Sequence, residues 1–295
     1  MKRCSFRTVA IAALAMAVMI SDAEAQRGRG DGFGGGRMQG EARPDGGGPD
    51  REIIGAFSPV RANLSDMEKR GFIATGLTAV YPDAANCLPI VSPFASSTRH
   101  DGTPRSTRFF DGLHGGADIA APGGTPLLAI ADGTVVHMHE GENIGGISLF
   151  LQHSPQDTGL PVWLYTEYKH LREMPPLRPG QRVRMGEKIA LVGNTGTTGG
   201  RAYGAAGFYH LHWTAFYSRT SDYTAGRLFV PEGARWLDPL AVFLRESLDS
   251  RSIGDLPSDR KKVRIAYRTA DGRVVPGDAR IIWPIACEAR YSNSQ

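Results

Sequence analysis

The sequence predicts an all-β fold for the central part of the chain, residues 88–247. Short apolar or β-branched runs alternate there with glycine, proline and Asp-Gly turn signals, a pattern typical of β-strands. The region is long enough to bury one hydrophobic core, so we expect a single self-supporting domain. The predicted strands are 126–131, 134–139, 147–152, 162–168, 188–192 and 211–217.

Two short helices flank the central strands in this prediction. An N-terminal segment, residues 51–87, contains a helical pattern over 64–71. Asn63 or Ser65 is suited to cap this helix, because both side chains accept hydrogen bonds from free backbone N–H groups. A second helix over 237–247 would close the β domain.

Two Asp-Gly pairs mark turns between predicted strands. The pair at 132–133 separates two of the central strands and favours a hairpin, because Asp-Gly adopts the backbone conformations of tight hairpin turns. The pair at 271–272 joins residues 263–268 to 273–275 in a C-terminal extension, residues 248–295, that is also mainly β. The sequence leaves open whether this extension continues the main sheet or forms a separate unit.

The first 50 residues have the composition of an export signal followed by a linker. A basic start precedes an apolar stretch over 9–20 and Ala23-Glu24-Ala25, a small-x-small pattern typical of a cleavage site. The apolar stretch is short for a bilayer span, so residues 1–25 are predicted to be a signal peptide for export to the periplasm or the cell wall. Residues 26–50 are rich in glycine and poor in apolar residues, which indicates a disordered linker.

Three cysteines are present, and Cys4 lies in the predicted signal peptide. Cys87 and Cys287 remain, one near each end of the folded part. In an oxidising compartment such a pair usually forms a disulfide. We therefore predict a bridge that ties the C-terminal tail to the start of the core, with two buried, unlinked thiols as the alternative.

The net charge of the chain, +4, is modest and limits the classes of partner that it can be expected to bind. It favours anionic surfaces such as cell-wall polymers and is too small to argue for nucleic acid. No segment after the signal is long and apolar enough to span a membrane, so the mature chain is predicted to have no membrane span. The sequence does not give the oligomeric state.

Three separated fragments of the sequence hold side chains suited to a metal site. In His210-Leu-His212 the neighbouring residues favour a strand, where side chains two positions apart share one face. One imidazole can then bind a metal while the other acts on substrate or water. His114 and Asp118 stand in a glycine-rich stretch, where Gly115 and Gly116 are expected to let the backbone bend so that both side chains converge.

These fragments hold enough donors for a zinc site that acts as a hydrolase. Such a site needs three protein ligands and one open position. Two imidazoles and a carboxylate leave it with one net positive charge, which lowers the pKa of a bound water towards neutrality. His170, in the third fragment, follows a predicted strand and is suited to proton transfer or to stabilising an oxyanion.

The other four histidines are predicted to lie at the surface. His137 and His139 repeat the two-residue spacing, but the residues that follow, 140–143, are typical of an exposed hairpin end. Metal binding by this pair is therefore the less favoured alternative. His100 and His153 stand next to turn-forming residues.

With these motifs the chain resembles the M23 family of peptidoglycan metallopeptidases, also called the lysostaphin or LytM type. The resemblance covers about residues 88–217, and the motifs follow the family's order. They are Leu113-His-Gly-Gly-Ala-Asp118-Ile-Ala-Ala-Pro-Gly-Gly-Thr-Pro126, Ala131-Asp-Gly-Thr-Val135, Tyr168-Lys-His-Leu171, Gly180, Gly193-Asn-Thr-Gly196 and His210-Leu-His212-Trp213.

The resemblance implies a catalytic domain built on an antiparallel, sandwich-like β-sheet with an open zinc groove. It implies a secreted zinc endopeptidase that hydrolyses peptide bonds in the cross-bridge or stem peptide of peptidoglycan. By position, it assigns His114, Asp118 and His212 as the ligands of one Zn²⁺ per chain. It assigns His170 and His210 as catalytic histidines outside the ligand set, and does not say which of them is the general base.

Two segments are longer than the family's usual loops. Residues 197–209 are expected to remodel one wall of the groove, which puts the substrate preference in doubt. Residues 95–111 carry Arg99, Arg105 and Arg108, which are suited to meet carboxylates of a peptide stem. A solvated loop is the alternative for these arginines.

Two other functions stay open. Some relatives lack zinc ligands and act as binding modules that regulate cell-wall amidases, but all five key positions are filled in this chain. A zinc endopeptidase that acts on a glycine-rich exported protein is the second alternative. The sequence also leaves open whether residues 26–87 block the groove before processing.

Overall fold

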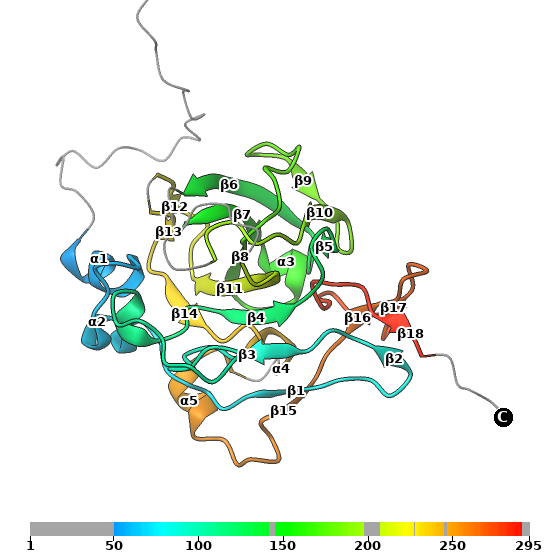
Figure 1. Cartoon of the computed structure of the whole chain (residues 1–295), viewed down its shortest axis with the longest axis horizontal. Helices are drawn as coiled ribbons and strands as arrows, with labels where there is room; N and C mark the ends of the chain where they lie inside the picture. Colours follow the sequence, from blue (N-terminus) through cyan, green and yellow to red (C-terminus); the bar gives the residue numbers. More distant parts are fainter. Residues whose placement is uncertain (1–49, 142–144, 198–206, 227, 245–246, 291–295) are drawn as a thin grey trace, which may run out of the picture. The chain divides into compact units, whose positions relative to one another are not determined.

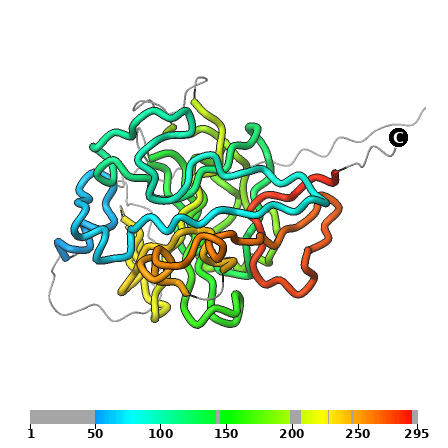
Figure 2. Tube along the Cα trace, turned by 90° about the horizontal axis from the view of Figure 1, so that it is seen from below, coloured from blue at the N-terminus to red at the C-terminus, as the bar shows by residue number. Residues whose placement is uncertain are grey.

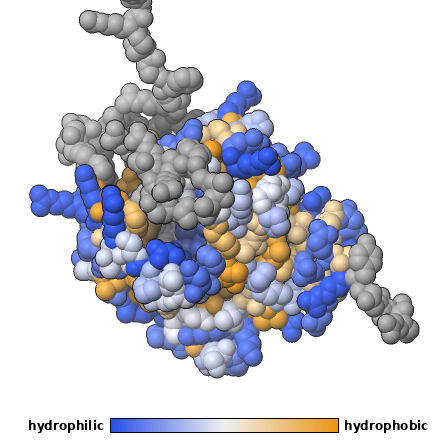
Figure 3. Space-filling model, in the orientation of Figure 1, coloured by the Kyte–Doolittle hydropathy of each residue, from blue (hydrophilic) through white to orange (hydrophobic). Residues whose placement is uncertain are grey.

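Figure 1 shows the computed structural model of the chain, which describes residues 50–141, 145–197, 207–226, 228–244 and 247–290. The predicted signal peptide and residues 26–49 of the predicted linker lie outside this part. The described residues form one compact unit. No helix among them has the length and apolar character needed to cross a membrane. Figure 3 shows that polar and apolar residues are interspersed on the face seen in Figure 1.

Short strands dominate the structure, so the all-β prediction is confirmed. The helices are α1 (Arg51–Phe57), α2 (Leu64–Lys69), the 3-10 helix η1 (Phe110–Gly112), α3 (Pro155–Thr158), α4 (Ala241–Leu244) and α5 (Ser250–Gly254). The strands are β1 (Thr78–Val80), β2 (Ala85–Asn86), β3 (Ile90–Ser92), β4 (Ala117–Ala120), β5 (Pro126–Leu128), β6 (Gly133–Gly141), β7 (Gly146–His153), β8 (Trp163–Lys169), β9 (Arg182–Val183), β10 (Lys188–Leu191), β11 (His210–Ser218), β12 (Tyr223–Thr224), β13 (Val230–Pro231), β14 (Arg235–Leu237), β15 (Lys262–Arg264), β16 (Tyr267–Arg268), β17 (Val274–Val275) and β18 (Glu288–Ala289).

The main sheet has the order β3-β4-β11-β8-β7-β6-β9, with β14 paired to β11 outside this path. Every pair in it is antiparallel. Alternate residues of β11 face opposite sides, so Trp213 and Ala215 enter the larger core while Phe216 enters a second aromatic cluster. His212 and Thr214 share the side of Phe216, and the candidate site lies on this side.

The hairpin predicted at Asp132–Gly133 is wrong. β5 pairs with β10, and β6 pairs with β7 and β9, so the chain changes sheets at this point. A Cβ on Gly133 would lie 2.6 Å from Nδ1 of His153 and 2.9 Å from the carbonyl oxygen of Gln152. Position 133 is therefore a glycine because a side chain would not fit there. The Asp-Gly pair resembles a hairpin turn signal but does not form a hairpin.

His153 is fully buried, so the prediction that it lies at the surface is also wrong. One ring nitrogen, Nδ1, lies 2.7 Å from the carbonyl oxygen of Asp132, and the other lies 3.0 Å from Oγ1 of Thr166. Burial lowers the pKa of His153 to about 4. The imidazole is thus a neutral polar link inside the core.

Both predicted helices are present in the described part of the chain, and both are shorter than predicted. α2 begins at Leu64 with Asn63 as its cap, since the Asn63 side chain accepts a hydrogen bond from the Asp66 backbone at 3.1 Å. The predicted helix over 237–247 is reduced, in the described part of the chain, to the single turn α4. Asp238 accepts a hydrogen bond from the Leu240 backbone just before it.

Strands from the N-terminal and C-terminal parts of the described chain lie side by side (Figure 2). β1 pairs in parallel with β15, and β2 pairs with β18. The turn predicted at 271–272 joins β16 to β17. The C-terminal strands therefore form small separate sheets and do not extend the main one, although Trp283 and Ile285 enter the main core.

Cys87 and Cys287 lie beside these paired ends, with their Cα atoms 4.4 Å apart, a separation that a disulfide spans. We expect mass spectrometry of the non-reduced protein to find one linked peptide containing both residues. Loss of the bridge in Cys287→Ser should lower the free energy of unfolding by about 2–5 kcal/mol. Two free thiols in protein purified from an oxidising compartment would reject the prediction.

Candidate metal centre

The sheet brings the side chains of His114, Asp118 and His212 together. Asp118 on β4 and His212 on β11 are direct partners in the register of these strands, and His114 lies just before β4. Nε2 of His114 is 3.0 Å from Oδ1 of Asp118 and 3.0 Å from Nδ1 of His212. Nδ1 of His212 is 2.9 Å from the same oxygen. Two nitrogens and one oxygen thus form a small triangle, and no other such group occurs among the described residues.

This triangle fits a tetrahedral zinc ion. Zinc bonds of about 2.0–2.1 Å place two ligand atoms about 3.3 Å apart, close to the observed separations. The second nitrogen of each ring is held by an oxygen, since His114 Nδ1 donates to the Pro93 carbonyl at 3.0 Å and His212 Nε2 lies 3.1 Å from Thr214 Oγ1, to which it can donate. These bonds place the ring protons away from the centre and leave lone pairs on the nitrogens that face it.

His170 and His210 stand beside this triangle. Their ring centres are 4.8 Å apart, and that of His170 is 5.7 Å from His212. His170 Nδ1 donates to the Thr195 carbonyl at 2.7 Å, and His210 Nδ1 donates to the Phe208 carbonyl at 2.9 Å. All four imidazoles therefore have one nitrogen fixed by an oxygen. His170 has a φ of 62°, in the left-handed region that few non-glycine residues adopt.

The charge states of these groups suit metal binding. Burial lowers the pKa of His212 to about 4, and it lowers the pKa values of His170 and His210 as well. Burial alone would raise the pKa of Asp118, but the facing imidazoles of His114 and His212 hold it well below 3.8. At neutral pH the centre thus combines a neutral His212 imidazole with an ionised Asp118 carboxylate, the forms in which these side chains bind metals.

Gly116 is needed for space at this centre. A Cβ there would lie 2.5 Å from the Trp213 carbonyl oxygen and 3.0 Å from Nε2 of His212. Neither Gly115 nor Gly116 has a positive φ. The chain bends at both glycines, as expected, and Gly116 also lets the segment just before β4 approach β11 closely.

Gly116→Ala is expected to destabilise the fold by about 1–3 kcal/mol and to weaken metal binding roughly tenfold or more, because the new methyl group displaces the His212 ring. Denaturant unfolding and competition with a chelator measure the two effects. Gly277→Ala is the matched control, since a Cβ there has no atom within 4 Å. Equal metal affinity in the Gly116 variant and the control would contradict the prediction.

The remaining histidines do not join the centre. His137 and His139 stack on one another with ring centres 6.0 Å apart, and His137 also packs on Phe229. Both are half-buried, so they are less exposed than predicted. His100 is exposed as predicted, and its ring stacks on Phe208 at 3.8 Å.

The three arginines of residues 95–111 have different environments. Arg99 donates to the Pro104 carbonyl within the segment, and exposed Arg108 lies over the Phe109 ring. Arg105 is instead drawn into the metal centre, where Nη2 lies 3.5 Å from Oδ2 of Asp118. No motif in the sequence distinguishes Arg105 from the other two.

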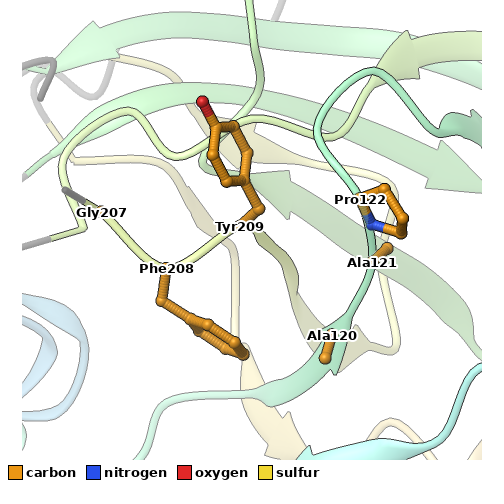
Figure 4. Close-up of a pocket in the computed structure, with 6 residues that line it drawn as sticks. All are labelled: Ala120, Ala121, Pro122, Gly207, Phe208 and Tyr209. Carbon is orange, nitrogen blue, oxygen red and sulfur yellow. The ribbon is translucent and has the colours of Figure 1, made fainter. Parts of the chain in front are cut away.

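An open apolar hollow adjoins the centre (Figure 4). Phe208 forms part of it and is stacked between His100 and His210, with ring centres 3.8 and 4.9 Å away. Tyr209 beside it is 42 % exposed. The lining residues are Ala120, Ala121, Pro122, Gly207, Phe208 and Tyr209. Most of the long segment before His210, residues 198–206, lies outside the described part.

Antiparallel strands that present two imidazoles and a carboxylate, with further imidazoles beside them, are an arrangement used by metal-dependent hydrolases. Residues 112–222 form a domain that matches the description Peptidase family M23.

Known relatives share only part of their length with this chain. It is 29% identical over 187 residues to an uncharacterized metalloprotease of Haemophilus influenzae, which covers 63% of this chain and 31% of that protein. It is 34% identical over 100 residues to the peptidoglycan DD-endopeptidase ShyA of Vibrio cholerae, covering 34% and 19%. The catalytic domain of lysostaphin from Staphylococcus simulans aligns with a TM-score of 0.33 and 21% identity, over 54% of this chain and 90% of that one. The chain thus spans less than a third of the length of the first two proteins.

Proposed function

We propose that this chain is an exported zinc endopeptidase that hydrolyses peptide bonds in peptidoglycan. The observation that carries the proposal is the triangle of His114, Asp118 and His212, beside which two more imidazoles are left over for chemistry. The match of residues 112–222 to the M23 family and the similarity to a peptidoglycan DD-endopeptidase support the substrate class.

In this proposal one Zn²⁺ is held by Nε2 of His114, Oδ1 of Asp118 and Nδ1 of His212. When bound, zinc polarises the scissile carbonyl and activates water as a nucleophile. Nε2 of His210 lies 3.4 Å from Oδ1 of Asp118 and can accept a proton, because the carboxylate favours the imidazolium that results. His170 and His210 share proton transfer and stabilisation of the tetrahedral oxyanion, and the order of their roles stays open.

The surroundings of the centre suit an extended peptide with small side chains. In the register of the sheet, the half-buried Lys169 on β8 neighbours His212. Its ammonium group is suited to bind the carbonyl and carboxylate groups of a peptide. On the other side, the hollow beside His210 has alanine, proline and aromatic walls, which suit the methyl group of an alanine residue in a stem peptide.

The test combines zinc content with muropeptide release on purified residues 26–295. One zinc per chain together with new uncross-linked muropeptides is the expected result. Zinc without cleavage of sacculi, but with cleavage of a glycine-rich peptide, would move the substrate to an exported protein. A chain that purifies without zinc and cleaves neither substrate would reject the enzyme and favour a module that regulates cell-wall amidases.

A further inference from the structure

Arg105 enters the metal centre from residues 95–111, outside the metal-binding motifs. Its Nε donates to the Thr98 carbonyl at 3.1 Å, and its Nη2 donates to Ser92 Oγ at 2.7 Å. Its side chain is 19% exposed. Ser92 is the register partner of Asp118 on the neighbouring strand β3. The guanidinium is therefore anchored at the edge of the centre and is not a solvated side chain.

The two oxygens of Asp118 have different partners. Oδ1 is the oxygen that lies 3.0, 2.9 and 3.4 Å from the ring nitrogens of His114, His212 and His210. Oδ2 lies 3.5 Å from Nη2 of Arg105. Among the described residues, Arg105 is the only lysine or arginine that forms an ion pair with Asp118. One oxygen thus faces the imidazoles and the other faces a fixed cation.

A carboxylate can give a metal ion one oxygen or two, and the choice decides how many positions remain for water and substrate. A hydrolytic zinc ion keeps one position open beside three protein ligands. If Asp118 turned to give both oxygens, it would fill that position. The guanidinium opposes this turn, because Oδ2 would leave its cationic partner and the metal ion would draw closer to that cation.

We propose that Arg105 is a positioning residue that holds Oδ2 of Asp118 in an ion pair, so that this carboxylate binds metal through Oδ1 alone. The inference rests on the metal site proposed above. Arg105 also balances the buried charge of Asp118 when no metal is bound. Residues 95–111 thereby gain a role at the reaction centre that no motif in them indicates.

Loss of the Arg105 cation is expected to change metal affinity and catalytic rate in opposite directions. Without the cation, Asp118 is free to give both oxygens and the metal no longer faces a nearby positive charge. Because the repulsion between the guanidinium and the metal ion is removed, Arg105→Gln should bind metal about tenfold more tightly and yet have a lower kcat. An arginine that only supported the fold would, when replaced, loosen the site and weaken metal binding.

Cobalt(II) provides the direct test, because its visible absorption is strong in four-coordinate sites and weaker as the coordination number rises. We would load the mature wild-type chain, Arg105→Gln and the control Arg108→Gln with Co²⁺, record the spectra, and measure Co²⁺ affinity by chelator competition. The expected result is a weaker absorption and a tighter affinity for Arg105→Gln alone. Arg108 is a matched control because it lies on the same segment, is exposed and contacts the Phe109 ring.

Unchanged spectra, or weaker binding by Arg105→Gln, in a wild-type chain that binds Co²⁺ would overturn the inference and leave the proposed function standing. A wild-type chain that binds no Co²⁺ would overturn both. If Arg105→Gln does not fold, Arg105→Lys keeps the charge but lacks the fork that reaches Ser92 and Asp118 together. It should change the spectrum and the affinity in the same directions by a smaller amount, and no change in either would again reject the proposal.

Discussion

His210→Ala is expected to lose peptidoglycan hydrolysis and keep its metal, whereas His212→Ala is expected to lose both. Nδ1 of His212 is one corner of the donor triangle, 3.0 Å from Nε2 of His114 and 2.9 Å from Oδ1 of Asp118. His210 lies outside this triangle and contacts Asp118 only at 3.4 Å. Loss of a positioned proton-transfer group costs about 10²–10⁴-fold in rate.

For His212→Ala the metal affinity should fall by at least about 100-fold, because loss of a mere hydrogen-bond partner of a metal ligand already lowers metal affinity or activity by about 10–100-fold. Elemental analysis gives the zinc content, and muropeptide release gives the rate. His139→Ala is the control. His139 lies on β6, on the same face of the sheet as His212 and two strands beyond Lys169, the partner of His212 on β8. Full activity in metal-loaded His210→Ala would reject the proposed role of His210.

Only part of the site geometry follows from short-range patterns that can be read in the sequence. His210 and His212 alternate with apolar residues, so their shared face follows from strand geometry alone. The register of β4 and β11 then places Asp118 opposite His212. The shared face could be predicted because it depends on local periodicity, whereas the meeting of the three fragments could be expected only from the family resemblance.

The misplaced features depend on contacts between distant segments. A side chain at Gly133 would collide with the ring of His153. A side chain at Gly116 would collide with β11. Arg105 could not be separated from its neighbours in the sequence, since its position depends on Ser92 and Asp118 in two other strands. Composition and turn signals carry no information about such contacts.

The second large effect that we expect is a gain of stability in Asp238→Asn at neutral and alkaline pH. Asp238 is buried between β14 and α4, where it accepts hydrogen bonds from Thr75 Oγ1 and, at 3.0 Å, from the Leu240 backbone. No ion pair of Asp238 occurs among the described residues. Burial raises the pKa of this carboxyl from 3.8 to about 6.

The sign of the pH dependence follows from this raised pKa. In the unfolded chain the carboxyl ionises near 3.8, whereas in the folded chain it stays protonated up to about 6. Its favourable contribution to folding is complete below 3.8 and is lost as the pH rises through 6. Above that pH the buried charge costs about 3 kcal/mol relative to the protonated form. Asparagine keeps the shape and removes the charge.

Asp238→Asn should therefore raise the free energy of unfolding by up to about 3 kcal/mol at pH 8 and change it little at pH 4. His153 acts in the opposite sense, because its pKa of about 4 makes its contribution complete above 6.5 and lost as the pH falls through 4. Both chains contain His153, so the difference between variant and wild type cancels its effect. Asp83→Asn, at an exposed carboxylate, controls for the loss of one negative charge. A variant less stable than wild type at pH 8 would mean that the hydrogen bonds to the carboxylate outweigh the cost of burying its charge.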